Sequence, residues 1–360
     1  MRKKTIQFLM LAMLIPLTIG LIMNGCKKDD DEPEPVPVNF TALDGLITDA
    51  HTIHDGAVEG EDIGEYQAGS KAELQTSIDL AETVRNTSGV TQAQVDAAVV
   101  NLQAALTVFE SKKITEIAPE NLVAEWRMNG DATDNSGNGH DGELKEGYSL
   151  NGGGTVQNTT DRFGNPDYAY KFSAGGNIEV PNATAFNPPD LTIVTWIQLD
   201  ETWAHNYFLS NDIWNCWKLQ VQDANKPFFT RKILKDDGSG DFAWIDKDSN
   251  TGVLENDVWT HIAVSFKSGE MTFYINGENV MFWDDFPTGT PVEPNPLVNL
   301  VIGQALPTGI YSDVPGDPYE WQEWLGYLKG SLDDLKFYNI VLTDAQVHSI
   351  YSWENEHVIE

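Results

Sequence analysis

Trp259 to Val280, which reads W-T-H-I-A-V-S-F-K-S-G-E-M-T-F-Y-I-N-G-E-N-V, decides the fold of this chain. Apolar residues take every second position in two runs, Ile262, Val264 and Phe266 in the first and Met271, Phe273 and Ile275 in the second. Such alternation places one face of a strand against a core and the other in a polar environment. A polar connection, residues 267–270, separates the runs and contains Gly269, so the stretch predicts an antiparallel hairpin. Asn276-Gly277 predicts a type I′ turn into another strand, residues 279–283.

The sequence around the hairpin consists of short apolar runs between clusters of Gly, Asn, Asp and Pro. The strands predicted there are Leu122–Met128, Tyr168–Phe172, Asn177–Val180, Leu191–Leu199, Trp214–Gln222, Lys226–Lys232, Leu297–Gly303 and Leu325–Tyr338. Many short strands with turn residues between them favour an all-β sandwich. A terminal helix is predicted after Thr343, which with Gln346 has the spacing of a capping box.

Six short motifs in this region occur in the order in which laminin-G-like domains contain them. They are Trp126 with Asp134-x-Ser136-Gly137-Asn138 and Gly142, Tyr170-x-Phe172, Leu191-Thr192-Ile193 with Trp196, the hairpin, Ile302-Gly303, and Gly330-Ser331-Leu332-Asp333-Asp334-Leu335-Lys336-Phe337-Tyr338-Asn339. Residues 121–360 therefore resemble a laminin-G-like domain of the concanavalin A-like class. The resemblance implies a mainly β fold, a jelly-roll β-sandwich, and it leaves the function open.

Residues 40–113 have the apolar periodicity of helices instead. Three segments carry it, and the second and third begin at Ser70-x-x-Glu73 and Thr91-x-x-Gln94, which predict capping boxes. Because the connections are short, we predict a small antiparallel three-helix bundle. The stretch from Gly64 to Ile78 resembles the FIVAR-type helical modules of cell-surface proteins, and the resemblance implies a spacer or an interaction module.

The N-terminus has the pattern of a targeting segment, residues 1–25. A basic start precedes an apolar stretch, residues 5–22, which is too short for a stable membrane span. Asn24-Gly25-Cys26 resembles the lipobox of bacterial lipoproteins, which implies a lipid anchor on Cys26. Residues 26–39 are acidic and proline-spaced, and they predict an extended tether.

The acidic run directly after Cys26 resembles the surface-export signal of outer-membrane lipoproteins. It implies an outer-membrane protein that faces the cell exterior, and the alternative is a merely solvated tether. The only other cysteine is Cys216, so no intrachain disulfide is expected.

The chain is strongly acidic, with 22 Lys and Arg against 55 Asp and Glu and a formal net charge of −33. Such a surface repels phosphates, which argues against nucleic acid and anionic membrane surfaces as partners. It suits a neutral ligand or a site that collects cations. The alternative is an acidic secreted protein whose charge only keeps it soluble.

No group of residues in the sequence predicts catalysis. Glycosidases of related folds need two carboxylates held across the sugar. Asp333 and Asp334 lie in succession on a predicted strand, where neighbouring side chains point to opposite faces, and Glu320 and Glu323 fall in a loop. We therefore predict that the chain has no catalytic residues.

A calcium site is predicted at Asp131, Asp134 and Asn138, because these residues gather hard oxygen ligands in a Gly-rich loop. Related jelly rolls often bind calcium, and the resemblance implies that Asp333 supplies a further ligand. The alternative is that Asp134 and Asn138 only close turns with their own backbone.

Aromatic residues in loops and at strand ends form the candidate glycan site. The loop from Gln304 to Trp324 is long for a strand connection, and such loops are usually functional or mobile. Sugars stack their C–H faces on aromatic rings, whereas Asp, Asn and Gln bind their hydroxyls. The predicted ligand-binding residues are Tyr311, Tyr319, Trp321, Trp324, Trp283 and Trp214. The alternative is a lid whose rings pack down on the sandwich.

The function that these patterns favour is glycan binding by a non-catalytic, surface-exposed lipoprotein, with the bundle as a spacer. A second hypothesis is an adhesion or assembly protein whose laminin-G-like domain binds a protein partner through a flat apolar patch. A glycoside hydrolase is the third, and it requires two converging carboxylates.

Overall fold

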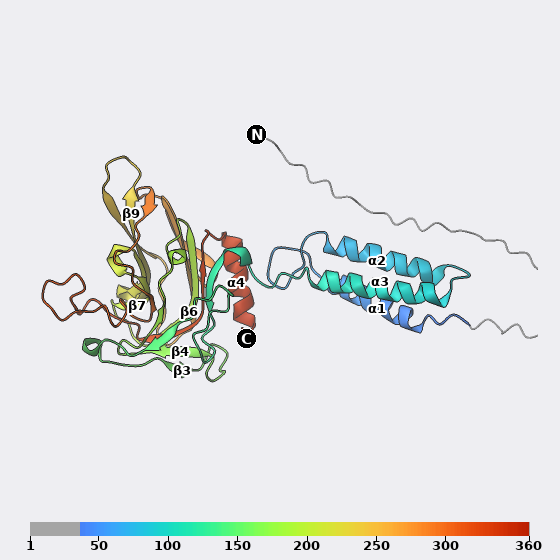
Figure 1. Cartoon of the computed structure of the whole chain (residues 1–360), viewed down its shortest axis with the longest axis horizontal. Coiled ribbons are helices and arrows are strands. Elements are labelled where there is room, and N and C mark those ends of the chain that lie inside the picture. Colours follow the sequence, from blue (N-terminus) through green and yellow to red (C-terminus); the bar gives the residue numbers. More distant parts are fainter. Residues whose placement is uncertain (1–36, 360) are drawn as a thin grey trace, which may run out of the picture.

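The computed structural model describes residues 37–359. A helical bundle and a β-sandwich follow one another along the chain, and Figure 1 shows the sandwich at one end of the bundle. The predicted fold class, a β-sandwich preceded by a small helical bundle, is confirmed. The predicted signal peptide, Cys26 and residues 26–36 of the predicted tether lie outside the described residues.

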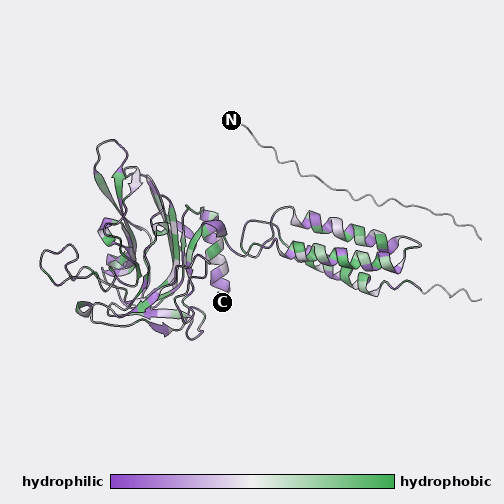
Figure 2. Ribbon diagram, viewed as in Figure 1, coloured by the Kyte–Doolittle hydropathy of each residue, from purple (hydrophilic) through white to green (hydrophobic). Residues whose placement is uncertain are grey.

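The bundle contains helices α1 (Thr41–Gly56), α2 (Ser70–Asn86) and α3 (Gln92–Glu110). Each helix turns an apolar stripe toward the other two, so that the three stripes form one core (Figure 2). Its buried members include Leu43, Ala50, Leu74, Ile78, Val95, Leu102 and Leu106. None of the helices among the described residues has the length and apolar character needed to cross a membrane.

The two predicted capping boxes of the bundle have different outcomes. Thr91 and Gln94 form the box that begins α3. The box predicted at Ser70 is wrong, because Ser70 is already the first helical residue and Gly69 precedes it with φ of 88°. Glycine adopts this left-handed conformation without a steric penalty, and it sets the chain direction into α2.

The first sheet of the sandwich grows around the predicted hairpin, in the strand order β13-β12-β11-β6-β16-β4-β3, with β1 paired to β16. Its strands are β1 (Leu122–Trp126), β3 (Gln157–Thr159), β4 (Ala169–Phe172), β6 (Leu191–Leu199), β11 (Thr260–Lys267), β12 (Glu270–Ile275), β13 (Glu278–Trp283) and β16 (Gly330–Tyr338). All pairings are antiparallel, and the hairpin register sets Val264 opposite Phe273.

The second sheet has the order β10-β9-β8-β7-β15-β5-β2, with β14 paired to β9. Its strands are β2 (Glu143–Lys145), β5 (Asn177–Val180), β7 (Asn206–Asn211), β8 (Trp217–Gln222), β9 (Lys226–Lys235), β10 (Phe242–Asp248), β14 (Gly289–Pro291) and β15 (Leu300–Ile302). Five strands were not predicted from sequence, namely β2, β3, β7, β10 and β14. Three of these contain only three residues each, which is too short for a period-two pattern.

One large apolar core lies between the sheets. Five of the six alternating hairpin positions are buried in it, and the sixth, Ile275, packs against it half-buried. Trp126 and Trp217 are also fully buried there, and their indole N–H groups donate to the carbonyl oxygens of His140 at 2.9 Å and Phe186 at 2.8 Å. Because both donors are satisfied, the large rings enter the core without an unpaired polar group.

The C-terminal helix α4 (Asp344–Glu356) packs on the outer face of the first sheet (Figure 1). Val194 and Ala263 point out of the sandwich and form a small apolar cluster with Val347 and Ile350 of the helix. The predicted Thr343–Gln346 capping box begins α4. In Figure 1 the opposite side of the sandwich, at β7 and β9, has no α-helix of the described residues over it.

Charged side chains are buried beneath α4. Arg162 Nη1 lies 2.5 Å from Asp333 Oδ2 and 2.8 Å from Asp334 Oδ2, and Lys336 Nζ lies 2.7 Å from Glu354 Oε1. The prediction that Asp333 and Asp334 point to opposite faces is therefore wrong. The register shifts between Asp333 and Lys336, and Asp334 has φ of 46°, so this bulge turns both carboxylates toward Arg162.

The bundle contacts the sandwich through the loop between α1 and α2. Ile63 of that loop packs in one cluster with Ile117 and Ile350, and its backbone N–H donates to Ser349 Oγ at 3.0 Å. The two parts thus have separate cores and a smaller shared cluster. Whether residues 40–113 and 121–360 fold as separate units stays a prediction.

We expect Glu354→Gln to lower the free energy of unfolding by about 3 kcal/mol, because removing one partner of a buried ion pair leaves the other charge uncompensated. The low end of the known range applies because Glu125 and Glu116 also lie 3.7 and 3.9 Å from Lys336 Nζ. Urea denaturation measures the change. Glu356→Gln, on the exposed side of the same helix, is the matched control and should change stability by less than about 0.5 kcal/mol. Equal stability of the two variants would contradict this role of Glu354.

Candidate functional site

The structure places the six predicted ring residues in three different environments. Trp214 and Trp324 line a pocket on the outer face of the second sheet. Tyr311, Tyr319 and Trp321 pack into a small apolar cluster that Trp214 also joins, and Trp283 lies on β13. The pocket is the best candidate for a ligand site.

This pocket has a volume of about 320 Å³ and lies over β7, β8 and the start of β9. We call it the aromatic pocket, and the residues that define it are Tyr207, Trp214, Lys218, Gln220, Phe228 and Trp324. It combines four rings with polar groups, which is the composition that sugar and cofactor sites share.

The strand period explains why these side chains meet. Along β8, Trp217, Leu219 and Val221 enter the core, so the residues between them face outward. Gln220 lies opposite Tyr207 of β7 and opposite Phe228 of β9 in the strand register. Cross-strand neighbours on one face are close enough to touch, so Tyr207, Gln220 and Phe228 form a continuous row across the three strands.

Lys218 forms the floor of the aromatic pocket and is only 2% exposed. Its Nζ donates to the Tyr207 hydroxyl at 2.9 Å and to Gln220 Oε1 at 2.6 Å. The same atom lies 3.8 Å from the ring centroid of Trp214, 4.5 Å from that of Tyr207 and 5.3 Å from that of Phe228. Ring faces attract a cation, so three rings hold this ammonium group in place.

The electrostatics of the pocket follow from its burial. Burial lowers the pKa of Lys218 to about 7, against the opposing effect of Asp246 on β10. Burial raises the pKa of Tyr207 well above its ordinary value and lowers that of His205 at the rim. Near neutral pH the phenol therefore stays protonated, and the charge of the lysine responds to what binds beside it.

The two predicted rings in the pocket differ in exposure. Trp324 is 41% exposed, at the end of the long loop that begins after β15. Trp214 is half-buried in a short 3₁₀ turn before β8, and its carbonyl accepts the indole N–H of Trp244 at 2.7 Å. Trp324 thus offers the more open stacking face.

The remaining rings of the long loop pack against the sandwich. Tyr311 is 8% exposed, Trp321 Nε1 donates to Asn151 Oδ1 at 2.8 Å, and the Tyr319 hydroxyl donates to Asp212 Oδ2 at 3.4 Å. All three rings belong to one small apolar cluster beside the aromatic pocket. Their placement agrees with the lid alternative, and ligand binding by them stays a prediction.

Trp283 is not among the residues that line the aromatic pocket. It lies half-buried on β13, where its Nε1 donates to the carbonyl oxygen of Asp248 at 3.1 Å. Lys247 Nζ lies 4.2 Å from its ring centroid. These contacts give Trp283 a structural environment between the two sheets' edge strands.

Asp134 and Asn138, two of the residues predicted to bind calcium, form hydrogen bonds within their own loop and to β1. The carboxylate of Asp134 accepts backbone N–H groups at 2.8 to 3.0 Å from Glu125, Ser136 and His140. Burial alone would raise the pKa of Asp134, but these hydrogen bonds outweigh it and lower the pKa. Asn138 Nδ2 donates to two carbonyl oxygens of β1.

The other two predicted ligands have different partners. Asp131 accepts the backbone N–H of Thr133, and Asp333 pairs with Arg162 beneath α4. Between residues 37 and 359, no three or more His, Cys, Asp or Glu side chains are grouped so that they can hold a metal ion. Asp134 closes a turn, in agreement with the turn alternative, whereas the Asn138 side chain bonds β1 instead. Calcium binding stays a prediction.

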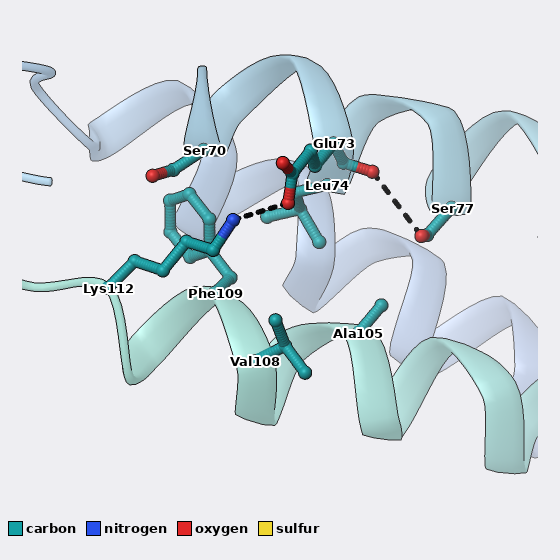
Figure 3. A pocket seen from close by; sticks show the side chains of 8 residues that line it. All are labelled: Ser70, Glu73, Leu74, Ser77, Ala105, Val108, Phe109 and Lys112. Carbon is teal, nitrogen blue, oxygen red and sulfur yellow. Dashed lines mark hydrogen bonds and ion pairs between the residues drawn. The ribbon is translucent and has the colours of Figure 1, made fainter. Parts of the chain in front are cut away.

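A second pocket, of about 240 Å³, lies between α2 and α3 (Figure 3). Leu74, Val108 and Phe109 contribute apolar surface, and an ion pair between Glu73 and Lys112 spans its edge. Because the two charges satisfy each other, the pocket offers apolar surface without a free polar group for recognition. It agrees with a bundle that serves as a spacer or contact module.

The family-model match lies within the sandwich. Residues 172–348 match the family model described as the concanavalin A-like lectin/glucanases superfamily. A stretch of 80 residues is 35% identical to a gellan lyase from Bacillus sp, and it spans 22% of this chain. The match covers only 3% of the length of that lyase.

Solved structures with a similar fold share little sequence with this chain. Domain 4 of AbnA, a GH43 extracellular arabinanase from Geobacillus stearothermophilus in complex with arabinotriose, is 20% identical with a TM-score of 0.45, over 64% of this chain and 98% of that one. The binding domain of Paraclostridial Mosquitocidal Protein 1 is 18% identical with a TM-score of 0.46, over 65% of this chain and 52% of that one.

These similarities to solved structures assign no ligand to this chain. The matched family region contains every strand from β5 to β16 and the whole aromatic pocket. The predicted resemblance to a laminin-G-like domain of the concanavalin A-like class is therefore confirmed for residues 172–348.

Proposed function

We propose that the protein is a non-catalytic glycan-binding protein and that the aromatic pocket is its binding site. The observation that carries this proposal is the combination of Trp324, Trp214 and Phe228 around a polar floor of Lys218 and Gln220. Rings supply stacking faces for the C–H surface of a sugar, and polar groups fix its hydroxyls. A superfamily that includes lectins supports the same reading.

The polar groups around the rings suit hydroxyl recognition. Gln220 Nε2 donates to the Ala204 carbonyl at 3.0 Å and its Oε1 accepts from Lys218, so the amide is held rigidly. Asp223 at the rim is exposed, and a carboxylate accepts hydroxyl hydrogen bonds. Asp223 is the only acid among the lining residues, whereas glycoside hydrolysis needs two carboxylates. The pocket thus fits binding better than hydrolysis.

A protein partner is the second candidate function, and one observation favours it. Phe242 and Trp244 of β10 are 49% and 47% exposed, and they extend the aromatic surface beyond the pocket. Exposed aromatic side chains are enriched where proteins bind one another. Phe242 and Trp244 would equally serve as a stacking surface for a glycan that extends beyond the pocket.

We also propose that a lipid on Cys26 anchors the protein in the outer membrane, facing the cell exterior, with residues 26–39 as a tether. The support is the lipobox-like pattern of the sequence. Labelling with a fatty-acid analogue should mark the parent chain and not Cys26→Ala, because acylation requires the thiol. Undiminished labelling of Cys26→Ala would refute the anchor.

The glycan proposal is tested with the chain from residue 27 onward on a glycan array, followed by titration calorimetry. We expect Trp324→Ala to weaken binding of the best array ligand by about 1–2 kcal/mol, or roughly 5- to 30-fold, since a stacking ring is lost. Its melting temperature should stay near that of the parent, because the ring is 41% exposed.

Trp321→Ala is the matched control, since Trp321 lies in the same loop but packs against the sandwich. It should reduce stability by roughly 3 kcal/mol through loss of packing and leave the affinity of the folded protein unchanged. An array on which no glycan binds the parent protein would refute the proposed function. So would a Trp324→Ala variant with full affinity.

A further inference from the structure

We propose that the glycan bound in the aromatic pocket carries a negatively charged group, a uronate carboxylate or a sulfate ester, and that Lys218 Nζ recognises this group. The inference rests on the proposed function and names the class of glycan. It starts from a buried lysine that lines the pocket and that no carboxylate of the described residues pairs with.

Lys218 differs from the other deeply buried lysine of the described residues. Lys336, beneath α4, lies within 2.7 to 3.9 Å of the carboxylates of Glu354, Glu125 and Glu116. Lys218 is equally buried but has a phenol and an amide oxygen as its hydrogen-bond partners. Neither partner carries a negative charge that offsets the cost of burying the ammonium group.

Lys218 has one N–H donor that a ligand can use. A protonated lysine has three N–H donors, and the two protein partners use two of them. Thr230, directly opposite on β9, is also fully buried and its hydroxyl has no hydrogen-bond partner. Two adjacent polar side chains on this face therefore have unused hydrogen-bonding capacity, which is unusual for buried groups.

A neutral glycan would not require this arrangement. Amide and carboxylate groups bind hydroxyls well without the cost of desolvating a cation. The chain also has a net charge of −33, so its overall field repels anions. A buried cation framed by rings provides a strong local attraction for one anionic group, because charge interactions weaken little where water is excluded.

The experiment compares matched pairs of oligosaccharides by titration calorimetry at pH 7. Oligogalacturonate and oligomannuronate are each paired with their carboxyl-reduced forms, and a chondroitin sulfate oligosaccharide is paired with its desulfated form. We expect the charged member of at least one pair to bind at least tenfold more tightly than its neutral counterpart. The uronate and sulfate arms identify which anion the pocket accepts.

Lys218→Met should remove this preference and leave the weaker binding of the neutral form. Lys232→Met is the matched control. Lys232 lies on β9, on the face of the sheet that carries Phe228 but outside the pocket lining, and its loss removes at least as much positive charge as the loss of Lys218 does at pH 7. It should keep at least tenfold preference. If both variants reduce the preference equally, bulk charge explains it and the inference is overturned.

The pH dependence provides a test that needs no variant. The charged groups near Lys218, which forms the pocket floor, are Asp246 and Asp223. His205 and Tyr207 are its neutral titratable neighbours. Between pH 7 and 9 both Tyr207 and His205 stay neutral, because burial raises the pKa of the phenol and lowers that of the imidazole.

Burial lowers the pKa of free Lys218 to about 7, and an anionic ligand favours its protonated form. Affinity for the charged member of a pair should therefore fall between pH 8 and 9, by at most about tenfold because one proton is linked to binding, while the affinity for the neutral member is unaffected.

Equal binding of charged and neutral members, or a charged-ligand affinity that does not change with pH, overturns the inference and leaves glycan binding intact. Absence of binding by every glycan refutes the proposed function instead.

Discussion

The packing of the two sheets against each other determines which side chains of this molecule can reach a ligand. Trp126, Trp217 and the hairpin residues Val264 and Phe273 lock the inner faces into one apolar core. Because strand side chains alternate, every residue that faces this core directs its neighbours outward. Packing of the core residues therefore also determines the outward direction of Lys218 and its neighbours on the same face.

The two outer faces of the sandwich differ in the partners of their buried cations. Beneath α4, Arg162 pairs with Asp333 and Asp334, and Lys336 pairs with Glu354, so each buried cation has its own carboxylate. A helix covers that face and it has no access for a ligand. On the second sheet, the ammonium group of the pocket floor has rings and neutral oxygens around it and an opening in front of it. The lack of a carboxylate partner together with this opening distinguishes Lys218 from the ion-paired cations beneath α4.

Much of the fold was predictable because the hairpin and its neighbours alternate strictly, whereas short edge strands such as Glu143–Lys145 carry no period at all. The site was predicted less well. Trp214 and Trp324 were selected as rings in loops, but that criterion also selected Trp321 and Tyr311, which pack inward. Loop sequence does not state which way a ring turns, since tertiary packing decides it.

Lys218 and Gln220 were not predicted as site residues, although the strand period indicated which way they point. Lys218 and Gln220 alternate with the apolar residues Trp217, Leu219 and Val221 on a predicted strand, so their outward direction follows from the strand period. The neighbouring strand that contributes Tyr207 to the same outer face was not predicted. Tyr207 belongs to β7, a strand that ends in asparagines at both sides and escaped prediction. Without β7, the hydrogen-bond partner of the lysine, Tyr207, was missing.

An acidic protein and an anionic ligand are compatible if attraction is local and repulsion is diffuse. Salt screens charges separated by more than about 8–10 Å in water, whereas a contact between Lys218 Nζ and an anion in a ring-lined pocket is screened far less. The diffuse negative field would then slow association and discourage unspecific anions, while the buried cation holds a glycan whose rings stack correctly. Rigidity adds to this selectivity, because Tyr207, Gln220 and Trp214 hold the ammonium group in place before any ligand arrives.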